Sequence, residues 1–262
     1  MSLDKYEIKK GIRNQGFFLI PNYFSKKRCI ELKYSIDKTM LLHSSLICPR
    51  HPNDISQSDN RIYGAEHLNP GIKDWFFNNK EILDVLQDLY QSAATIGTIL
   101  CQCVKPKNEN FGSASYWHRD SFRRQYKAFI FLSDVYANDG AFQFYSGTHK
   151  LAHKFRTLLK LGFKARNLSS YEPVTILNKV VPKYIAPESL ICSAGSLVFV
   201  DASVIHRGNP LLINTRYSLT YYMYKKTMPP HITALNKRAF INSNLTKEKN
   251  VNDILRTNKN IV

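Results

Sequence analysis

The stretch SLVFVDASVIHRGNPLLINTRYSLTYYMYKK, residues 196–226, decides the expected fold class. It holds two apolar runs rich in Val, Ile, Phe and Tyr, which are typical of strands, and the turn signal GNP separates them. The first run reads as one strand that carries His206 at its end. In the second run Arg216 and Ser218 stand two residues apart, so both project from the same face of a strand. The stretch therefore predicts β-structure that presents polar side chains near strand ends.

Short runs of the same kind fill the chain from about residue 95 onward. They read TILCQCVK, SASYWH, YKAFIFLSDV and AFQFYSG, and turn signals such as NDG and SAG divide them. Many short strands that follow helical segments predict a sandwich or jelly roll with helices packed outside. We expect a fold that is mainly β with flanking helices (α+β), with a jelly-roll core over about residues 95–225.

The first 95 residues are expected to be mainly helical. No linker or internal repeat divides the chain, so we expect a single domain, residues 1–262, with a basic, polar tail from about residue 226. The elements expected before the core are a helix over 4–14, a strand within 16–24 that runs into a turn at Pro21-Asn22, a helix capped by Ser25, a long polar loop over 43–70 and a helix within 78–97.

The charge balance is strongly basic. Lys and Arg number 37 against 20 Asp and Glu, a formal net charge of +17. Such a balance indicates an anionic partner, which would be nucleic acid, a membrane surface or an acidic or phosphorylated substrate. A compositional bias of the genome, with the lysines simply solvated, is the alternative explanation.

Targeting signals and disulfides are not indicated. No apolar run approaches the roughly 18 residues that cross a bilayer, and the first residues lack the apolar block of a secretory signal, so we expect a cytoplasmic protein. The cysteines lack a paired spacing, and we expect reduced thiols that are mostly buried. They are Cys29, Cys48, Cys101, Cys103 and Cys192.

A second histidine and a carboxylate occur in YWHRD, residues 116–120. In a strand, His118 and Asp120 project from one face about 7 Å apart. With His206 as a third ligand, two imidazoles and one carboxylate leave three positions open, the pattern that non-haem Fe(II) uses in oxygen activation. Arg216 can bind a carboxylate through paired N–H donors, with the Ser218 hydroxyl assisting, which suits a dicarboxylate co-substrate.

Taken in this order, the residues resemble the metal triad and 2-oxoglutarate anchor of Fe(II)/2-oxoglutarate-dependent oxygenases. The flanking segments GFFLIPNYFSKKRC, FLSDVYANDGAFQFYSGTHK and SAGSLVFVDASVIHRGNPLLINTR are similar to the phytanoyl-CoA dioxygenase-like family, over roughly residues 11–225. Ser146 departs from the proline that is usual there. The resemblance implies a double-stranded β-helix (a cupin-like jelly roll). It also implies Fe(II) on His118, Asp120 and His206, with 2-oxoglutarate and O2 as co-substrates and ascorbate helpful in vitro.

The resemblance also bears on residues near the triad. Phe129 resembles a position that contacts the co-substrate, and either Tyr116 or Trp117 is expected to line the pocket. His149 sits in a turn in the family, so we expect a structural role and not a fourth ligand. Three arginines are expected to flank the mouth of the site, as contacts for an anionic substrate or as solvated side chains: Arg119, Arg123 and Arg124.

The implied reaction couples decarboxylation of 2-oxoglutarate to hydroxylation of an unactivated C–H bond. The charge favours an acidic or phosphorylated substrate, small or lipid-linked, such as the sugar Kdo on lipid A. A hydroxylase of acyl-CoAs or natural products is the alternative within the family. A nucleic-acid demethylase lacks support from any recognition motif, so nucleic acid is not expected as a partner. The complete triad argues against a non-catalytic binding module.

The stretch from Gly140 to Tyr171 contains no acidic residue. A helix over about 150–163 would gather four apolar side chains in one stripe with basic residues around it. Such a helix fits either a lid whose stripe packs on the barrel or a peripheral contact with the inner face of an anionic membrane. The apolar side chains are Leu151, Phe155, Leu158 and Leu159.

Overall fold

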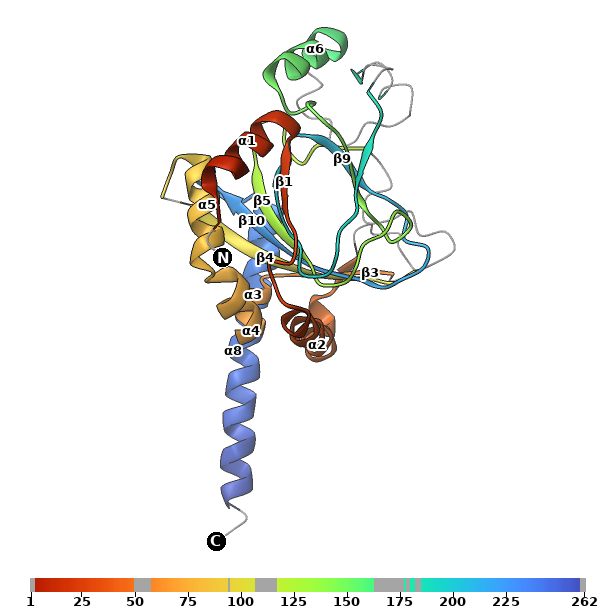
Figure 1. The fold of residues 1–262 in the computed structure, drawn as a ribbon. Coiled ribbons are helices and arrows are strands. Elements are labelled where there is room, and N and C mark those ends of the chain that lie inside the picture. The colour runs from red at the N-terminus through yellow and green to blue at the C-terminus, as the bar shows by residue number, and fades with distance from the viewer. Residues whose placement is uncertain are drawn as a thin grey trace.

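The computed structural model describes residues 3–49, 58–93, 95–106, 117–162, 177, 180–181 and 185–259, with the side chains of the last helix described to residue 244. Two antiparallel sheets face each other in a jelly roll with helices outside, which confirms the expected fold class (Figure 1). The large sheet has the order β1-β8-β5-β10-β4-β3-β2 and the small sheet the order β7-β6-β9.

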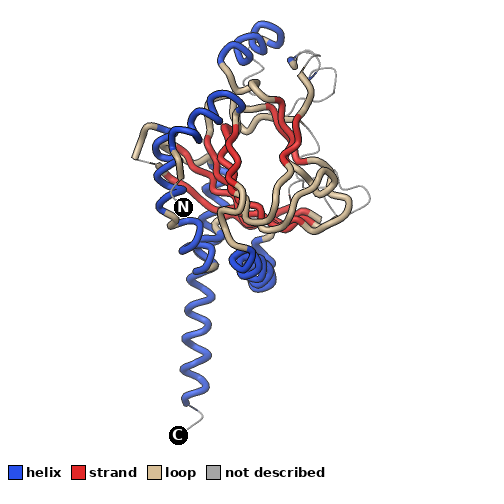
Figure 2. Tube along the Cα trace, in the orientation of Figure 1, coloured by secondary structure: helices blue, strands red, loops and turns tan. Residues whose placement is uncertain are grey.

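The strands account for both sheets as follows. The large sheet contains β1 (Phe17–Ile20), β2 (Cys48–Pro49), β3 (Asp59–Tyr63), β4 (Ile96–Val104), β5 (Tyr126–Phe131), β8 (Leu197–Asp201) and β10 (Arg216–Tyr224). The small sheet contains β6 (Phe142–Tyr145), β7 (Glu188–Leu190) and β9 (Ile205–Gly208). Figure 2 shows the strands of the two sheets on opposite sides of the barrel.

The helices lie outside the barrel, and the expected helices before the core are all present. They are α1 (Lys5–Gln15), α2 (Lys26–Leu42), η1 (Ser44–Leu46), α3 (Ala65–Leu68), α4 (Pro70–Ile72), η2 (Lys73–Phe77), α5 (Lys80–Tyr90), α6 (Leu151–Leu161) and α8 (Pro230–Lys259). Ser25 caps α2 as expected, since its hydroxyl accepts a hydrogen bond of 3.2 Å from the Arg28 amide. Helices α1, α2 and α5 contact the outer face of the large sheet.

The large sheet is buried on both faces, and alternate residues of β10 show how the faces divide. Leu219, Tyr221 and Met223 join the core beneath the helices, whereas Ser218 and Tyr222 point to the inside of the barrel. Every second position of this strand is therefore free to carry polar side chains for a site. The cysteines carry no disulfide, as expected, and three of the five are buried.

The expectation of a long loop over residues 43–70 is wrong for much of that range. Strand β3 pairs with β4, with Ile62 opposite Cys101, and α3 follows it. The strand was hidden because it is mostly polar and only Ile62 of its five residues is a fully buried apolar side chain. Its polar residues are accommodated because Arg61 pairs inside the barrel with Asp59.

The run SLVFVDASVIH is not one strand but two. It divides into β8 of the large sheet and β9 of the small sheet, and the chain crosses between them at 201–204. The Asp201 side chain makes the turn, because one oxygen accepts the Ser203 amide at 3.0 Å while the Asp201 carbonyl accepts the Val204 amide at 2.9 Å. This sheet crossing delivers His206 to the interior of the barrel.

The expected polar tail is a helix. Helix α8 runs from Pro230 to Lys259 and projects away from the barrel, at the end opposite α6 (Figure 1). Its first turns pack on β3 and α3. Among the described helices, none is both long and apolar enough to cross a bilayer.

Candidate metal and 2-oxoglutarate site

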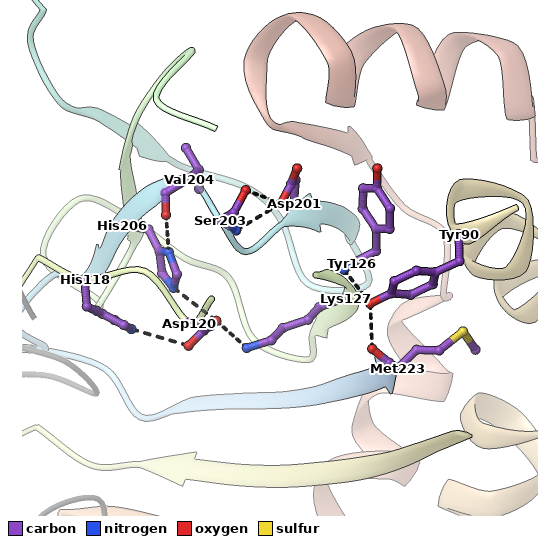
Figure 3. A network of polar contacts seen from close by, with 10 residues as sticks. All are labelled: Tyr90, His118, Asp120, Tyr126, Lys127, Asp201, Ser203, Val204, His206 and Met223. Carbon is purple, nitrogen blue, oxygen red and sulfur yellow. Dashed lines mark hydrogen bonds and ion pairs between the residues drawn. The ribbon is translucent and has the colours of Figure 1, made fainter. Parts of the chain in front are cut away.

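Two distant segments of the chain bring three side chains together inside the barrel: His118, Asp120 and His206. Their potential ligand atoms all lie within 4.8 Å of one another. The two Asp120 oxygens lie 3.7 Å from His118 Nε2 and 3.5 Å from His206 Nε2, so each faces one imidazole (Figure 3). Two nitrogens and a carboxylate around one point form a donor set that suits a divalent iron ion.

Backbone pairing fixes the positions of these residues. His118 and His206 exchange amide-to-carbonyl hydrogen bonds of 2.9 Å in both directions, in an isolated bridge and not in a regular strand. The expected strand before His118 lies outside the described residues up to residue 116. The Asp120 amide donates to the Ala202 carbonyl at 3.1 Å, which ties the carboxylate to the sheet crossing.

His206 is also oriented through its second ring nitrogen. Nδ1 lies 2.9 Å from the Val204 carbonyl, and a carbonyl can only accept, so Nδ1 carries the proton (Figure 3). Nε2 then faces Asp120 and is the ring nitrogen left to bind a metal ion. This is the second contact that metal-binding histidines usually make, and it fixes both the tautomer and the ring plane.

Lys127 contacts the triad, a position that the sequence did not predict for it. Its ammonium donates to Asp120 (Figure 3). The same ammonium lies 3.9 Å from the centre of the Tyr222 ring. Burial disfavours the Asp120 carboxylate, but the charges of Lys127, His206 and His118 outweigh it and hold the Asp120 pKa well below its usual range. The available signal was a lysine inside the otherwise apolar strand YKAFIF.

The opposite part of the interior holds a second polar group, around Arg216 and Ser218 of β10. Arg216 is buried and donates to the Gly140 carbonyl, and burial lowers its pKa to about 10 although Asp59 acts against this. The Ser218 hydroxyl donates to Gln102 Oε1 at 3.3 Å, and Gln102 donates in turn to Asp59 at 2.6 Å. Asp59 was missed because β3 was expected to be loop. Gln102 lies on β4, which was expected, but its partner Asp59 was not.

One cavity of about 450 Å³ connects these two groups. The triad and Arg216 with Ser218 all line it, and Phe129, Phe131 and Phe142 form an apolar wall between them. The ring centres of Phe142 and His206 are 5.1 Å apart. A cation site and a buried guanidinium across an apolar wall fit Fe(II) and a small dicarboxylate such as 2-oxoglutarate, and the cavity leaves further room for a substrate.

Two neighbours of the triad lie elsewhere. His149 does not join the described cluster, because its Nε2 lies 3.2 Å from the Arg13 carbonyl, as expected for a structural residue. Trp117 packs on Tyr145 and Arg207 and does not line the cavity. Tyr116, the other candidate, lies outside the described residues.

The three arginines expected at the mouth divide into two kinds. Arg119 lines the cavity, but its side chain is buried and its guanidinium donates to the carbonyls of Thr148 and Ser203. Arg123 and Arg124 are exposed at a hollow beside the cavity. Of the three arginines, this second pair has side chains exposed to solvent.

The family model of phytanoyl-CoA dioxygenase (PhyH) matches residues 12–211, most of the chain. The chain belongs to the phytanoyl-CoA dioxygenase family. It is therefore an Fe(II)/2-oxoglutarate-dependent oxygenase, whose cofactor is iron and whose co-substrates are 2-oxoglutarate and O2. A search of curated proteins found no match.

Solved structures of similar fold come from oxygenases at low sequence identity. The α-ketoglutarate-dependent carbocyclase SnoK from nogalamycin biosynthesis is 15% identical, with a TM-score of 0.65 over 88% of this chain and 90% of that chain. HygX from Streptomyces hygroscopicus, with nickel and 2-oxoglutarate bound, is 14% identical, with a TM-score of 0.58 over 85% and 87%. AviO1 from Streptomyces viridochromogenes is 16% identical, with a TM-score of 0.56 over 88% and 99%.

Proposed function

We propose that His118, Asp120 and His206 bind the iron, and that Arg216 with Ser218 binds the far carboxylate of 2-oxoglutarate. The observation that carries the proposal is the single cavity with three metal-type donors at one side and a buried guanidinium at the other. Phe129, on the wall between them, contacts the carbon chain of the co-substrate. A guanidinium offers two parallel donors to a carboxylate, and burial strengthens that pairing.

The protein's part in the reaction is to orient the metal-binding side chains and to exclude water from the site. When bound, Fe(II) supplies the oxygen activation that couples decarboxylation of 2-oxoglutarate to succinate with hydroxylation of a C–H bond. Val204 and Lys127 hold the His206 ring and the Asp120 carboxylate in place. The phenylalanine wall keeps water from the space between the metal and Arg216.

We propose that the substrate is acidic or phosphorylated, because the approach to the cavity is basic. A hollow beside the cavity shares Asp120, Gln125 and Tyr224 with it. Four exposed cations line this hollow: Arg123, Arg124, Lys225 and Lys226. Among the described residues that line cavity and hollow, Asp120 is the one acid, and it would be taken up by the metal. An anionic group on a substrate would find several cations here.

Two aromatic side chains in the cavity favour a substrate with a sugar ring. Tyr63 and Tyr222 both line it, with ring centres 5.8 Å apart, and aromatic faces suit the C–H faces of a sugar. An acidic sugar, free or lipid-linked like Kdo on lipid A, meets both requirements. For a lipid-linked substrate we extend the proposal to a cytoplasmic reaction at the inner face of a membrane. The alternative is a small-molecule or acyl-CoA hydroxylase; HygX and SnoN were solved with the small molecules hygromycin B and nogalamycin RO.

The test is a substrate screen that measures succinate release above the level without substrate. We expect acidic sugars and sugar phosphates to stimulate release, and His206→Ala to abolish it without loss of folded structure. For the active substrate, Arg123→Gln with Arg124→Gln should raise KM at least about tenfold, as expected from losing two charge contacts. The matched control replaces Lys26 and Lys27, exposed cations on α2, by Gln and should leave KM unchanged.

The outcomes separate the two parts of the proposal. Full turnover by His206→Ala would contradict the metal assignment. Turnover of an uncharged substrate that is insensitive to the two arginine substitutions would leave the oxygenase site standing and refute the anionic substrate.

A further inference from the structure

Helix α6 exposes its apolar face to solvent and turns polar side chains towards the barrel. Leu151, Phe155 and Leu159 follow one another at helical spacing and point to solvent, with 76%, 64% and 72% of their surface exposed. Lys154 and Thr157, on the other side, are buried. The alternative in which this stripe packs on the barrel as a lid is therefore not realised for these three residues.

The inward face is held by polar contacts, so the helix cannot turn its apolar side inward without losing them. The Lys154 ammonium donates to the Ser203 hydroxyl at 2.7 Å. The Arg119 guanidinium lies 3.2 Å from His153 Nδ1. Ser203 belongs to the crossing between β8 and β9, and Arg119 stands between two residues of the triad. The exposed stripe is thus fixed in direction by the same segment that positions His206.

The charge around the stripe points to an anionic partner. Arg156 and Lys160 are exposed and lie beside the stripe on the helix, and the sequence from 140 to 171 contains no acid. Helix α2 offers a contrast: three of its exposed apolar residues, Ile30, Tyr34 and Leu41, share one face and are 62%, 70% and 80% exposed. Asp37 lies on that same face, where it accepts a hydrogen bond from the Tyr217 hydroxyl. Of these two stripes, only that of α6 lacks an acid.

The position of α6 leaves it accessible to a broad surface. It stands at one end of the barrel, and α8 extends from the opposite end (Figure 1). We propose that α6 is an interfacial helix: Leu151, Phe155 and Leu159 enter the apolar edge of an anionic bilayer, and Arg156 and Lys160 contact lipid phosphates. The inference goes beyond the proposed function, because this surface lies outside the cavity and does not depend on which substrate the site accepts.

Co-sedimentation with vesicles tests the proposal. The full chain is mixed with vesicles of equal parts phosphatidylglycerol and phosphatidylcholine, or of phosphatidylcholine alone. We expect binding to the anionic vesicles that falls as salt rises. The variant Leu151→Ser, Phe155→Ser, Leu159→Ser should bind at least about tenfold more weakly, since it loses three side chains that would enter the apolar edge. Arg156→Gln should bind about fivefold more weakly.

The matched control applies the same chemistry to α2. The variant Ile30→Ser, Tyr34→Ser, Leu41→Ser removes three exposed apolar side chains from a face with an acid, and should bind anionic vesicles like the unmodified chain. Circular dichroism and the melting temperature check that both triple variants are folded.

A second readout reports insertion directly. Phe155→Trp should shift its fluorescence to shorter wavelength on anionic vesicles, and Tyr34→Trp should not. Equal loss of binding in both triple variants, absence of binding, or equal binding to neutral vesicles would overturn the proposal. So would a concentration-dependent dimer in solution that the α6 substitutions dissolve, because the stripe would then bind a second copy of the chain.

Discussion

Replacing Lys127 by Met should lower the stability of the metal-free protein and raise its affinity for metal. The Lys127 ammonium is buried and bound to Asp120, whose side chain is 26% exposed. Breaking a fully buried ion pair costs roughly 3–5 kcal/mol. Because Asp120 keeps some water, and because His118 and His206 lie close to it, we expect about 2 kcal/mol. For a chain of this size, that corresponds to a melting temperature lower by about 4–8 °C.

The effect on metal binding has the opposite sign. A divalent ion beside Asp120 would lie near the ammonium, and a double and a single positive charge about 5 Å apart repel by roughly 7 kcal/mol at an effective dielectric constant of about 20. Lysine flexibility relieves part of this, so we expect Lys127→Met to bind metal at least about fivefold more tightly. Metal should therefore raise the melting temperature of the variant more than that of the unmodified chain.

Differential scanning fluorimetry with and without metal, and calorimetric titration with Ni(II) as a redox-inert ion, measure both effects. Lys154→Met is the matched control, since Lys154 is also buried but donates to Ser203. It should leave the metal affinity unchanged. Unaltered metal affinity and melting temperature in Lys127→Met would refute the reasoning, and weaker metal binding would show that the ammonium supports the site.

Three further predictions concern separate features. Arg216→Ala should raise the apparent KM for 2-oxoglutarate at least tenfold in succinate-release assays, since losing one partner of a buried charge pair costs roughly 2–5 kcal/mol; an unchanged KM would move the carboxylate contact elsewhere. Gly195→Ala should destabilise by more than about 2 kcal/mol in urea unfolding, because Gly195 has φ +88° and an added Cβ would lie 2.1 Å from the Phe24 carbonyl oxygen. Burial lowers the pKa of Lys154 to about 8, so its charge costs stability below pH 8. Between pH 8 and about 10.5 the folded chain releases this proton before the unfolded chain does, and the unfolding free energy should rise by up to about 3 kcal/mol relative to Lys154→Met. A difference that does not vary with pH would contradict this.

Hydrophobic periodicity and capping residues were sufficient to predict several helices and strands. The helix after Ser25 and the strands β4, β5 and β10 were expected from periodicity and capping, and so was α6. Strand β3 was not, because its burial comes from pairing with β4 and from the ion pair of Arg61 with Asp59. The division of residues 196–206 was hidden because Asp201 reads as one more strand residue until its carboxylate makes a turn.

The candidate site shows the same division between what is local and what is not. His118, Asp120 and His206 could be identified from the sequence by their residue types and spacing, and the structure brings them together. The contact of Lys127 with Asp120 could not be predicted from the sequence, because only the fold sets which residues of β5 point inward. The direction of the α6 stripe could not be predicted either, since an amphipathic pattern does not show which face of the helix packs against the rest of the protein.

The backbone bridge between His118 and His206 has a consequence for biosynthesis. Each residue supplies the hydrogen-bond partners of the other, yet they belong to segments that leave the ribosome far apart in time. The strand that completes the pairing, β9, follows β8, whose edge must also receive β1 from the start of the chain. A nascent chain that ends before residue 206 holds two of the three donors but no assembled centre. Contacts of such long sequence separation form slowly, so iron would be acquired only by chains that have been almost fully synthesised.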